Sequence, residues 1–293
     1  MKKHWAMLDR VEVKNMIVDR DTSRANVKHA MTLGLPDIFR LPEWRKPKMG
    51  EPIAIVASGP SLRYTLSELA GFKTIMVAGS AHDFVRSKGL KPTYTVVCDP
   101  APAITASYLS KPSTTCNYLI ASMCDKGVFE QLKDYAVTMW HCGGEIEGED
   151  LLKGHVPPDV ITLNGGGCTV GLRCMDIANQ LGYYEMHLFG FDTCLDPNDE
   201  ATHSFPLNDP TKEFVDGNGK DVLEFKVGMD KKTARSFRVP TYLAVQAWDF
   251  EKLLKMSAGA ANFTVHGDGV INEMVRLYKA ALAKERMKLK AVG

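Results

Sequence analysis

Six short apolar runs of the chain each stop abruptly at a small or an acidic residue. They cover residues 53–57, 74–78, 94–98, 118–121, 186–189 and 263–265. Short, near-continuous apolar runs are typical of strands that are buried on both faces of a parallel sheet. In such sheets ligands bind outside the carboxyl ends of the strands, and here glycines, hydroxyls and carboxylates follow the runs. The pattern therefore predicts an α/β fold with a Rossmann-like, doubly wound, mostly parallel sheet and a nucleotide-type site at its carboxyl edge.

Helical patterns lie between and after these runs. Gly71 and Gly89 close the first two predicted helices, as glycine often does at a helix C-terminus. Further helices are predicted at residues 168–181, 241–256 and 271–290, the first of them with one apolar stripe at helical spacing. Crossover helices between parallel strands imply right-handed connections.

The sequence predicts a leader followed by one domain. Residues 1–49 are charge-rich and amphipathic, which predicts a helical leader whose role the sequence does not indicate. Residues 50–293 carry the strands and helices of a Rossmann-like nucleotide-binding domain. Within it residues 193–240 are polar and turn-rich, which predicts an insertion or lid. A hairpin turn is predicted at residues 216–219, because the sequence Asp-Gly-Asn-Gly there separates two apolar pairs.

The bulk composition limits the kinds of partner. With 36 Lys and Arg against 35 Asp and Glu, the formal charge is +1, so we expect no strong general binding of nucleic acid. The seven cysteines form no paired-cysteine motif, which predicts reduced core residues and no zinc site. No apolar stretch is long enough to span a bilayer. These observations predict a cytoplasmic protein without a membrane partner, and they leave a homo-oligomer open.

Ser58-Gly59-Pro60-Ser61 follows the first run at a strand-to-helix turn. Free backbone N–H groups and the positive end of a helix dipole make such a turn an anion seat. Glycine also permits close backbone approach to a phosphate. The same four residues fit a tight turn with a helix cap equally well. Gly79, which ends the second run, is placed with them at the predicted nucleotide edge.

A second glycine-rich helix start reads Asn164-Gly165-Gly166-Gly167-Cys168-Thr169. Three consecutive glycines cost chain entropy, so contact with a ligand explains them better than a simple connector does. Close packing of the helix on a neighbouring strand is the alternative. This helix start predicts a second phosphate or nucleotide contact.

Two carboxylates and one histidine are candidates for the chemistry. Asp99 and Asp192 each follow a buried strand, where an unpaired carboxylate is costly. They could bind Mg²⁺, bind a ribose hydroxyl or act as a general base, or else cap the following turn. His203 lies in the polar insertion soon after Asp192 and is an acid-base candidate. No serine-hydrolase elbow or paired-cysteine metal framework accompanies them.

Several of these motifs together resemble a known family. They are Ile55-Val56-Ala57-Ser58-Gly59-Pro60-Ser61-Leu62, Val96-Val97-Cys98-Asp99-Pro100, Gly165-Gly166-Gly167-Cys168-Thr169-Val170, Leu181-Gly182-Tyr183, Phe189-Gly190-Phe191-Asp192 and Thr202-His203. In this order, from about residue 52 to 268, they resemble the 6-hydroxymethylpterin diphosphokinase MptE-like family, which includes the motility-associated factor (Maf) flagellin glycosyltransferases. The chain is more distantly similar to bacterial sialyltransferases that use CMP-activated sugars, in which Gly-Asn stands where this chain has Ala57-Ser58.

The resemblance implies a nucleotide-activated donor held at the glycine-rich turns and at Asp99. The donor it implies is a CMP-, UDP- or GDP-sugar, or ATP. In the first case the chain is a glycosyltransferase-like enzyme in which Asp192 or His203 deprotonates an acceptor hydroxyl. In the second it is a pyrophosphokinase with Mg²⁺ held by Asp99 and Asp192. A non-catalytic nucleotide-binding module is the third hypothesis, and a compact member of this kind also fits a phage-encoded enzyme. The acceptor is not implied.

Overall fold

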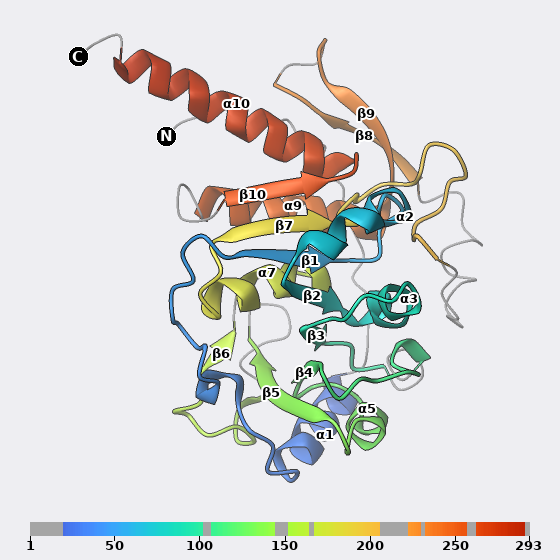
Figure 1. Cartoon of the computed structure of the whole chain (residues 1–293), viewed down its shortest axis with the longest axis vertical. Helices are drawn as coiled ribbons and strands as arrows, with labels where there is room; N and C mark the ends of the chain where they lie inside the picture. Colours follow the sequence, from blue (N-terminus) through green and yellow to red (C-terminus); the bar gives the residue numbers. More distant parts are fainter. Residues whose placement is uncertain are drawn as a thin grey trace.

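The computed structural model describes residues 20–101, 107–143, 152–163, 167–205, 222–229, 232–256 and 262–290. Its centre is an eight-stranded sheet in the order β10-β7-β1-β2-β3-β4-β5-β6, in which every neighbouring pair is parallel (Figure 1). The strands are β1 Pro52–Val56, β2 Thr74–Ala78, β3 Tyr94–Val97, β4 Asn117–Ala121, β5 Ala136–Cys142, β6 Thr162–Leu163, β7 Glu185–Phe189 and β10 Asn262–His266. The predicted Rossmann-like α/β fold is confirmed.

All six apolar runs form strands of this sheet, because both faces of the sheet are buried. In β1 the alternation is visible within four residues: Ile53 and Ile55 belong to one core cluster, and Ala54 and Val56 belong to the other. Side chains alternate between the faces of a strand, so a strand covered on both faces needs an unbroken apolar run.

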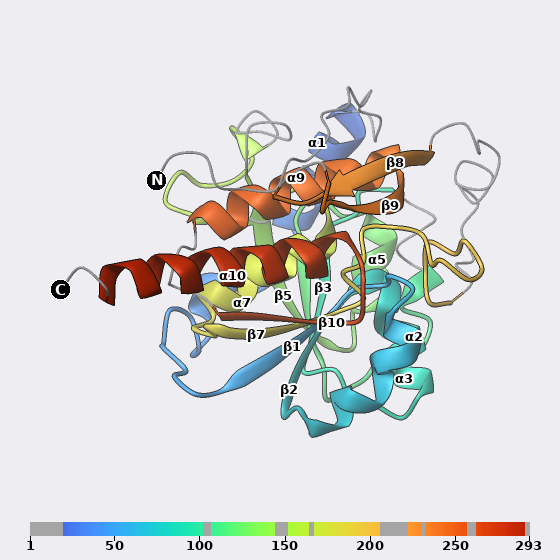
Figure 2. The same ribbon diagram turned by 90° about the horizontal axis from the view of Figure 1, so that it is seen from above.

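Helices cover the two faces of the sheet (Figure 2). They are α1 Arg20–Met31, α2 Leu62–Thr65, α3 His82–Ser87, α5 Lys126–Gln131, α7 Val170–Gln180, α9 Thr241–Met256 and α10 Val270–Lys290, with short 3-10 turns η1 Ile38–Arg40, η2 Leu66–Gly71 and η3 Gly79–Ala81. The face that carries Ala54 and Val56 also buries Leu62, Leu69 and Val85 of the α2–α3 region. The opposite face is covered by α7, α9 and α10.

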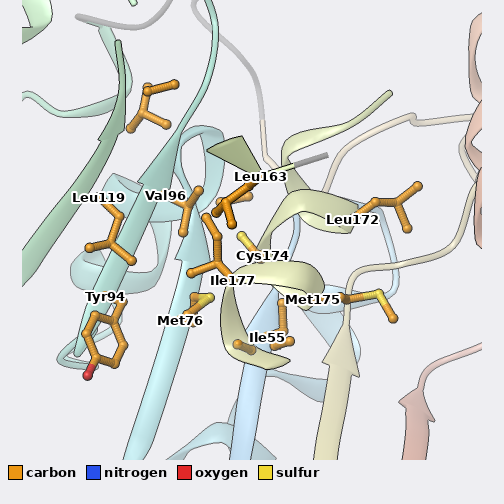
Figure 3. Packing of buried hydrophobic residues seen from close by; sticks show 14 of the residues in the cluster. Ile55, Met76, Tyr94, Val96, Leu119, Leu163, Leu172, Cys174, Met175 and Ile177 are labelled. Carbon is orange, nitrogen blue, oxygen red and sulfur yellow. The ribbon is translucent and has the colours of Figure 1, made fainter. Parts of the chain in front are cut away.

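The larger core is built around α7. Cys174, Ile177 and Ala178 are fully buried, and they lie against strand residues such as Ile55, Met76 and Val96 (Figure 3). The predicted apolar stripe of this helix is therefore its contact with the sheet. Gly182 ends the helix with a φ of +88°, as expected for a glycine after a helix C-terminus.

The strand order contains one reversal of direction, and it lies between β1 and β7. From β1 the chain runs through β2, β3, β4, β5 and β6 toward one edge, and it then returns to place β7 and β10 on the other side of β1. Because β1 and β7 are neighbours in the sheet, the turns that follow them meet at this point. This is the switch point at which ligands bind in open α/β sheets.

The polar insertion contains a two-stranded antiparallel hairpin, β8 Val222–Val227 with β9 Arg235–Pro240. The predicted turn at 216–219 lies outside the described residues, whereas the partner of β8 is a strand that the sequence patterns did not indicate.

Residues 1–19 of the predicted leader also lie outside the described part. The described part of the leader contains α1, which buries Val27 and Ala30 in the larger core. How the chain divides into domains stays a prediction. Among the described helices, none is long and apolar enough to cross a membrane.

Candidate functional site

The turns that follow β1, β7 and β10 pack tightly against one another at the switch point. The backbone N–H of Gly59 donates to the carbonyl of Gly190 at 2.9 Å, and the N–H of Val270 donates to the carbonyl of Asp192 at 2.8 Å. A side-chain carbon on Gly59 would overlap the Gly190 carbonyl and the Asp192 carboxylate. Glycine is required there because the two turns touch, so protein packing explains this glycine.

Asp192 lies at the centre of this junction. Its side chain accepts a hydrogen bond at Oδ1 from the backbone N–H of Ser61 at 3.1 Å. Its Oδ2 is buried and has no hydrogen-bond partner among the described residues, and the residue is 4 % exposed. Burial raises the pKa of Asp192 to about 7, against the opposing effect of the Ser61 hydrogen bonds. A carboxylate that titrates near neutral pH can accept a proton from a substrate under ordinary conditions.

A cavity of about 580 Å³ adjoins Asp192. Its walls come from the start of α2, the loop from Asp192 to Glu200, strand β9 and the turn between β10 and α10. The lining residues that carry polar or aromatic groups include Ser61, Tyr64, Asp192, Asp196, Glu200, Arg235, Phe237, Arg238 and Asp268. The volume is within the range of small-molecule sites.

Ion pairs and hydrogen bonds fix these walls. Arg235 pairs with both carboxylate oxygens of Asp268, at 3.0 and 2.8 Å, and Arg238 pairs with Glu200. The Tyr64 hydroxyl donates to Asp196 at 3.0 Å. The Asp268 pKa is lowered mainly by its hydrogen bond to Arg235. The cavity is therefore a built structure that joins the insertion to the edge of the sheet.

The structure brings together part of the sequence-predicted site. Pro60, Ser61 and Asp192 all line the cavity. Ser58 and Gly59 lie directly beside them, and Ser204 binds both. The Ser204 N–H donates to the Ser58 carbonyl at 2.9 Å, and the Ser204 hydroxyl donates to the Gly59 carbonyl.

The two other strand-end candidates lie further along the edge. Gly79 follows β2, begins η3 and lies against Val97. Asp99 follows β3 and caps its own turn, since its Oδ1 accepts from the Ala101 N–H at 2.9 Å. β3 and β7 are separated by β2 and β1, so Asp99 and Asp192 are about 14 Å apart by strand spacing.

This separation bears on the predicted magnesium site. A bound Mg²⁺ holds each ligand oxygen at about 2.1 Å, so one ion cannot be held by both Asp99 and Asp192. Among the described residues, no group of three or more His, Cys, Asp or Glu side chains is arranged to hold a metal ion. The donor set that the sequence suggested does not fit one shared ion.

His203 is placed near the β1 turn but does not line the cavity. Its Nδ1 lies 2.8 Å from the hydroxyl of Thr202, and its backbone carbonyl accepts from Arg63 at 3.4 Å. Arg63 is held in turn by Asp199 at 2.6 Å. The backbone of this segment therefore helps to fix the turn that carries Ser61.

The start of α7 is the second predicted phosphate-binding position, and a carboxylate of the chain already binds there. Asn164, Gly165 and Gly166 lie outside the described residues. Cys168 donates its backbone N–H to Oδ2 of Asp249 on α9 at 2.9 Å. Gly167 has a φ of +69°, and a side-chain carbon there would be 2.6 Å from Cβ of Asp249. Thr169 caps the helix by accepting from the Leu172 N–H at 3.4 Å.

Sequence patterns missed the residues that reach the site from the insertion and from α9. Arg235 and Arg238 lie on β9, which no alternation of apolar and polar residues marks. Asp249 lies within a predicted helix, where an acidic residue is ordinary surface. The one available signal was the Asp192–Glu200 loop, whose four acidic residues follow a buried strand.

Cys194, which lies at the cavity, is a packing residue. Cys194 lines the cavity but is 6 % exposed, and burial raises the pKa of its thiol to about 12. A thiol with such a pKa is protonated at neutral pH and is a poor nucleophile.

The strand order and the cavity at the carboxyl edge of the sheet define a doubly wound α/β protein with a polar site at its switch point. The family model of the 6-hydroxymethylpterin diphosphokinase MptE-like proteins matches residues 25–198, which is more than half of the chain. The chain belongs to this family. No curated protein matches it by sequence.

A solved structure shares the fold. A Maf glycosyltransferase from Magnetospirillum magneticum AMB-1 matches with a TM-score of 0.63 and 14 % sequence identity, over 85 % of this chain and 37 % of that chain. The chain thus spans little more than a third of that protein. A mammalian sialyltransferase matches with a TM-score of 0.41 and 8 % identity over 87 % of this chain and 81 % of that one. The sialyltransferase CstII from Campylobacter jejuni matches at 0.30 and 14 % identity over 74 % and 81 %.

Proposed function

We propose that this chain is a transferase that uses a nucleotide-activated donor and moves a sugar to an acceptor hydroxyl. The observation that carries the proposal is Asp192, a carboxylate with a pKa raised to about 7 beside a cavity at the switch point of the sheet. Family membership supports a transferase, since a diphosphokinase transfers a diphosphate group. The name of the Maf fold neighbour favours a glycosyl group.

In this mechanism the acceptor hydroxyl attacks the anomeric carbon of the donor. The new bond joins the acceptor oxygen to that carbon, while the bond from the carbon to the donor phosphate breaks and its electron pair leaves with the phosphate. The acceptor proton passes to Asp192, directly or through one water. Burial serves this step, because a carboxylate with an ordinary pKa near 4 would be a weaker base.

The phosphate of the donor would lie along the same edge, near Ser58–Ser61 and the start of α7. At the β1 turn the N–H of Gly59 is bound to the Gly190 carbonyl and that of Ser61 to Asp192, so a phosphate there would have to displace these partners. At α7 the N–H of Cys168 is bound to Asp249, so a phosphate there would have to compete with this carboxylate. His203 is a lesser candidate for the base, since its side chain lies outside the cavity wall.

The test is release of nucleotide from a panel of CMP-, UDP- and GDP-sugars, with and without Mg²⁺, compared with formation of AMP from ATP. Thermal shifts with the free nucleotides give the binding counterpart, because a ligand that binds only the folded state raises Tm. The proposal expects sugar-dependent nucleotide release that depends on Asp192. AMP formation that requires Mg²⁺ would instead support the diphosphokinase hypothesis. Binding without turnover, unchanged in His203→Ala and Asp192→Asn, would leave a nucleotide-binding module.

A further inference from the structure

The charges that line the cavity beside Asp192 are unbalanced. Among the described residues, four carboxylates face it against two guanidinium groups. They are Asp192, Asp196, Glu200 and Asp268 against Arg235 and Arg238. Even with Asp192 protonated, the described walls carry an excess of negative charge. An anionic group that moves into this cavity would meet like charges at close range, where the surroundings screen them less than bulk water does.

Both arginines that line the cavity already form ion pairs with carboxylates of the chain. Arg235 binds Asp268 through both terminal nitrogens and also lies 3.4 Å from Glu273. Arg238 pairs with Glu200. The bidentate Arg235–Asp268 pair uses the same fork of donors that would recognise a phosphate or a carboxylate of a ligand, whereas Arg238 contacts Glu200 through Nη1 alone. An anionic ligand would therefore have to break the pair to Asp268 to use the fork of Arg235.

Asp196 supplies negative charge that is only weakly offset. It is 4 % exposed, its Oδ2 accepts from the Tyr64 hydroxyl at 3.0 Å, and its Oδ1 accepts from the Asn198 N–H at 2.8 Å. The nearest described guanidinium nitrogen, on Arg63, is 4.0 Å away, and that guanidinium binds Asp199 at 2.6 Å. A ligand cation can therefore interact with Asp196 without displacing a tight ion pair.

Aromatic surface accompanies these charges. The Tyr64 side chain lines the cavity and the residue is 61 % exposed, and Phe237 lines it from β9. Aromatic faces attract ammonium groups and also pack against apolar faces of small ligands. Carboxylates beside aromatic rings thus suit a hydroxylated cation.

We infer that this cavity is an acceptor subsite that selects a molecule carrying an ammonium group beside its hydroxyl, an amino sugar or another amino alcohol. The inference rests on the proposed function, since it assigns the acceptor of that reaction. The ammonium group lies toward Asp196 and Tyr64, and the reacting hydroxyl lies toward Asp192. The anionic phosphate of the donor is excluded from this cavity and binds elsewhere along the edge.

The test measures binding of three matched probes to the full chain without a donor. They are methyl 2-amino-2-deoxyglucoside, methyl glucoside and methyl glucuronide, with the galactose series in parallel, titrated by ligand-observed NMR. We expect the amine to bind about tenfold more tightly than the neutral glycoside at about 0.05 M salt, and this preference to shrink at about 0.5 M. The glucuronide is expected to bind weakest.

Asp196→Asn tests the assignment within the cavity. Its oxygen can still accept from the Asn198 N–H and its NH2 can donate to the Tyr64 hydroxyl, but the charge is removed, so the preference for the amine should fall several-fold while the neutral glycoside binds as before. Asp249→Asn, which lies outside the cavity walls, is the matched control and should keep the preference. Equal binding of amine and neutral probes, tighter binding of the glucuronide, or no binding of the amine at all would overturn the inference.

These outcomes are separable from those of the proposed reaction. Sugar-dependent nucleotide release without any amine preference would overturn the inference and leave the transfer reaction standing. An amine preference that disappears in Asp196→Asn, in a protein without turnover, would support the cavity assignment and overturn the reaction.

Discussion

Two helix starts of this molecule look alike in sequence and differ in chemistry. At the β1 turn, the Ser61 N–H binds Asp192, and at the start of α7, the Cys168 N–H binds Asp249. In both places a carboxylate of the chain takes the position expected for a ligand anion. Asp192 is 4 % exposed and has an oxygen without a partner among the described residues, whereas Asp249 is paired with Lys252 at 3.0 Å.

The comparison shows that the chemistry at a helix start depends on what surrounds the bound carboxylate and not on the glycines. A lysine neutralises Asp249 and makes it a structural link between α7 and α9. Burial makes Asp192 costly to ionise, which is the property that a general base needs. Among the described glycines of these two starts, Gly59 and Gly167 leave no room for a side-chain carbon beside their neighbours.

The largest expected effect is the loss of activity in Asp192→Asn. We expect turnover to fall about 10²–10⁴-fold, since the amide cannot accept the acceptor proton. In the native protein kcat/KM should rise with pH up to about 7, where Asp192 becomes ionised, and then level off. Asp249→Asn is the comparison variant and should lose no activity and keep the same pH profile. Equal losses in the two variants would remove the distinction between the β1 turn and the start of α7.

The same substitution should also stabilise the protein at high pH. Because the folded pKa of about 7 lies above the ordinary value of 3.8, the folded state binds the proton more tightly. Asp192 therefore costs no stability from ionisation below about pH 4, and the cost grows between about pH 4 and pH 7 and then stays constant, at about 4 kcal/mol at most. Denaturant unfolding should show Asp192→Asn gaining stability at pH 8 and losing that gain at pH 4. A gain that does not change with pH would contradict the raised pKa.

Gly59→Ala tests how far the β1 turn depends on close packing. The new carbon would overlap the Gly190 carbonyl and the Asp192 carboxylate, and we expect a loss of about 1–3 kcal/mol of unfolding free energy. Gly71→Ala is the control, because no described atom lies within 4 Å of its added carbon. A loss no larger than that of the control would mean that the turns do not need their close contact.

The smallest effect is expected at the start of α7. Asp249→Asn keeps an oxygen for the Cys168 N–H but removes the ion pair to Lys252, and an exposed pair of this kind contributes about 0.2–1 kcal/mol. The variant should therefore unfold within about 1 kcal/mol of the native protein. Its affinity for the donor nucleotide should stay the same or rise, because a negative charge beside the phosphate is removed. A large loss of stability would show that Asp249 is more than a surface link.

The sequence predicts the sheet and half of the site. The six runs are strands because both faces of the sheet are buried, a condition that a short apolar stretch expresses directly. Asp192 and Ser61 could be found as residues at strand ends near a glycine.

The rest depends on tertiary contacts. The strand order places Gly59 against Gly190 and Asp99 three strands from Asp192. The insertion brings Arg235 and Arg238 of β9 to the cavity. No local pattern encodes these. Charged residues on an exposed hairpin have the same local signature whether they line a site or face solvent.

The most direct test of the account is the titration of Asp192 itself. Carboxyl ¹³C NMR of protein labelled at aspartate, with Asp192→Asn used to assign the resonance, gives its pKa without any substrate. The account predicts a midpoint near pH 7. A midpoint near 4 would mean that Asp192 is an ordinary turn-capping carboxylate, and the proposed base would be wrong.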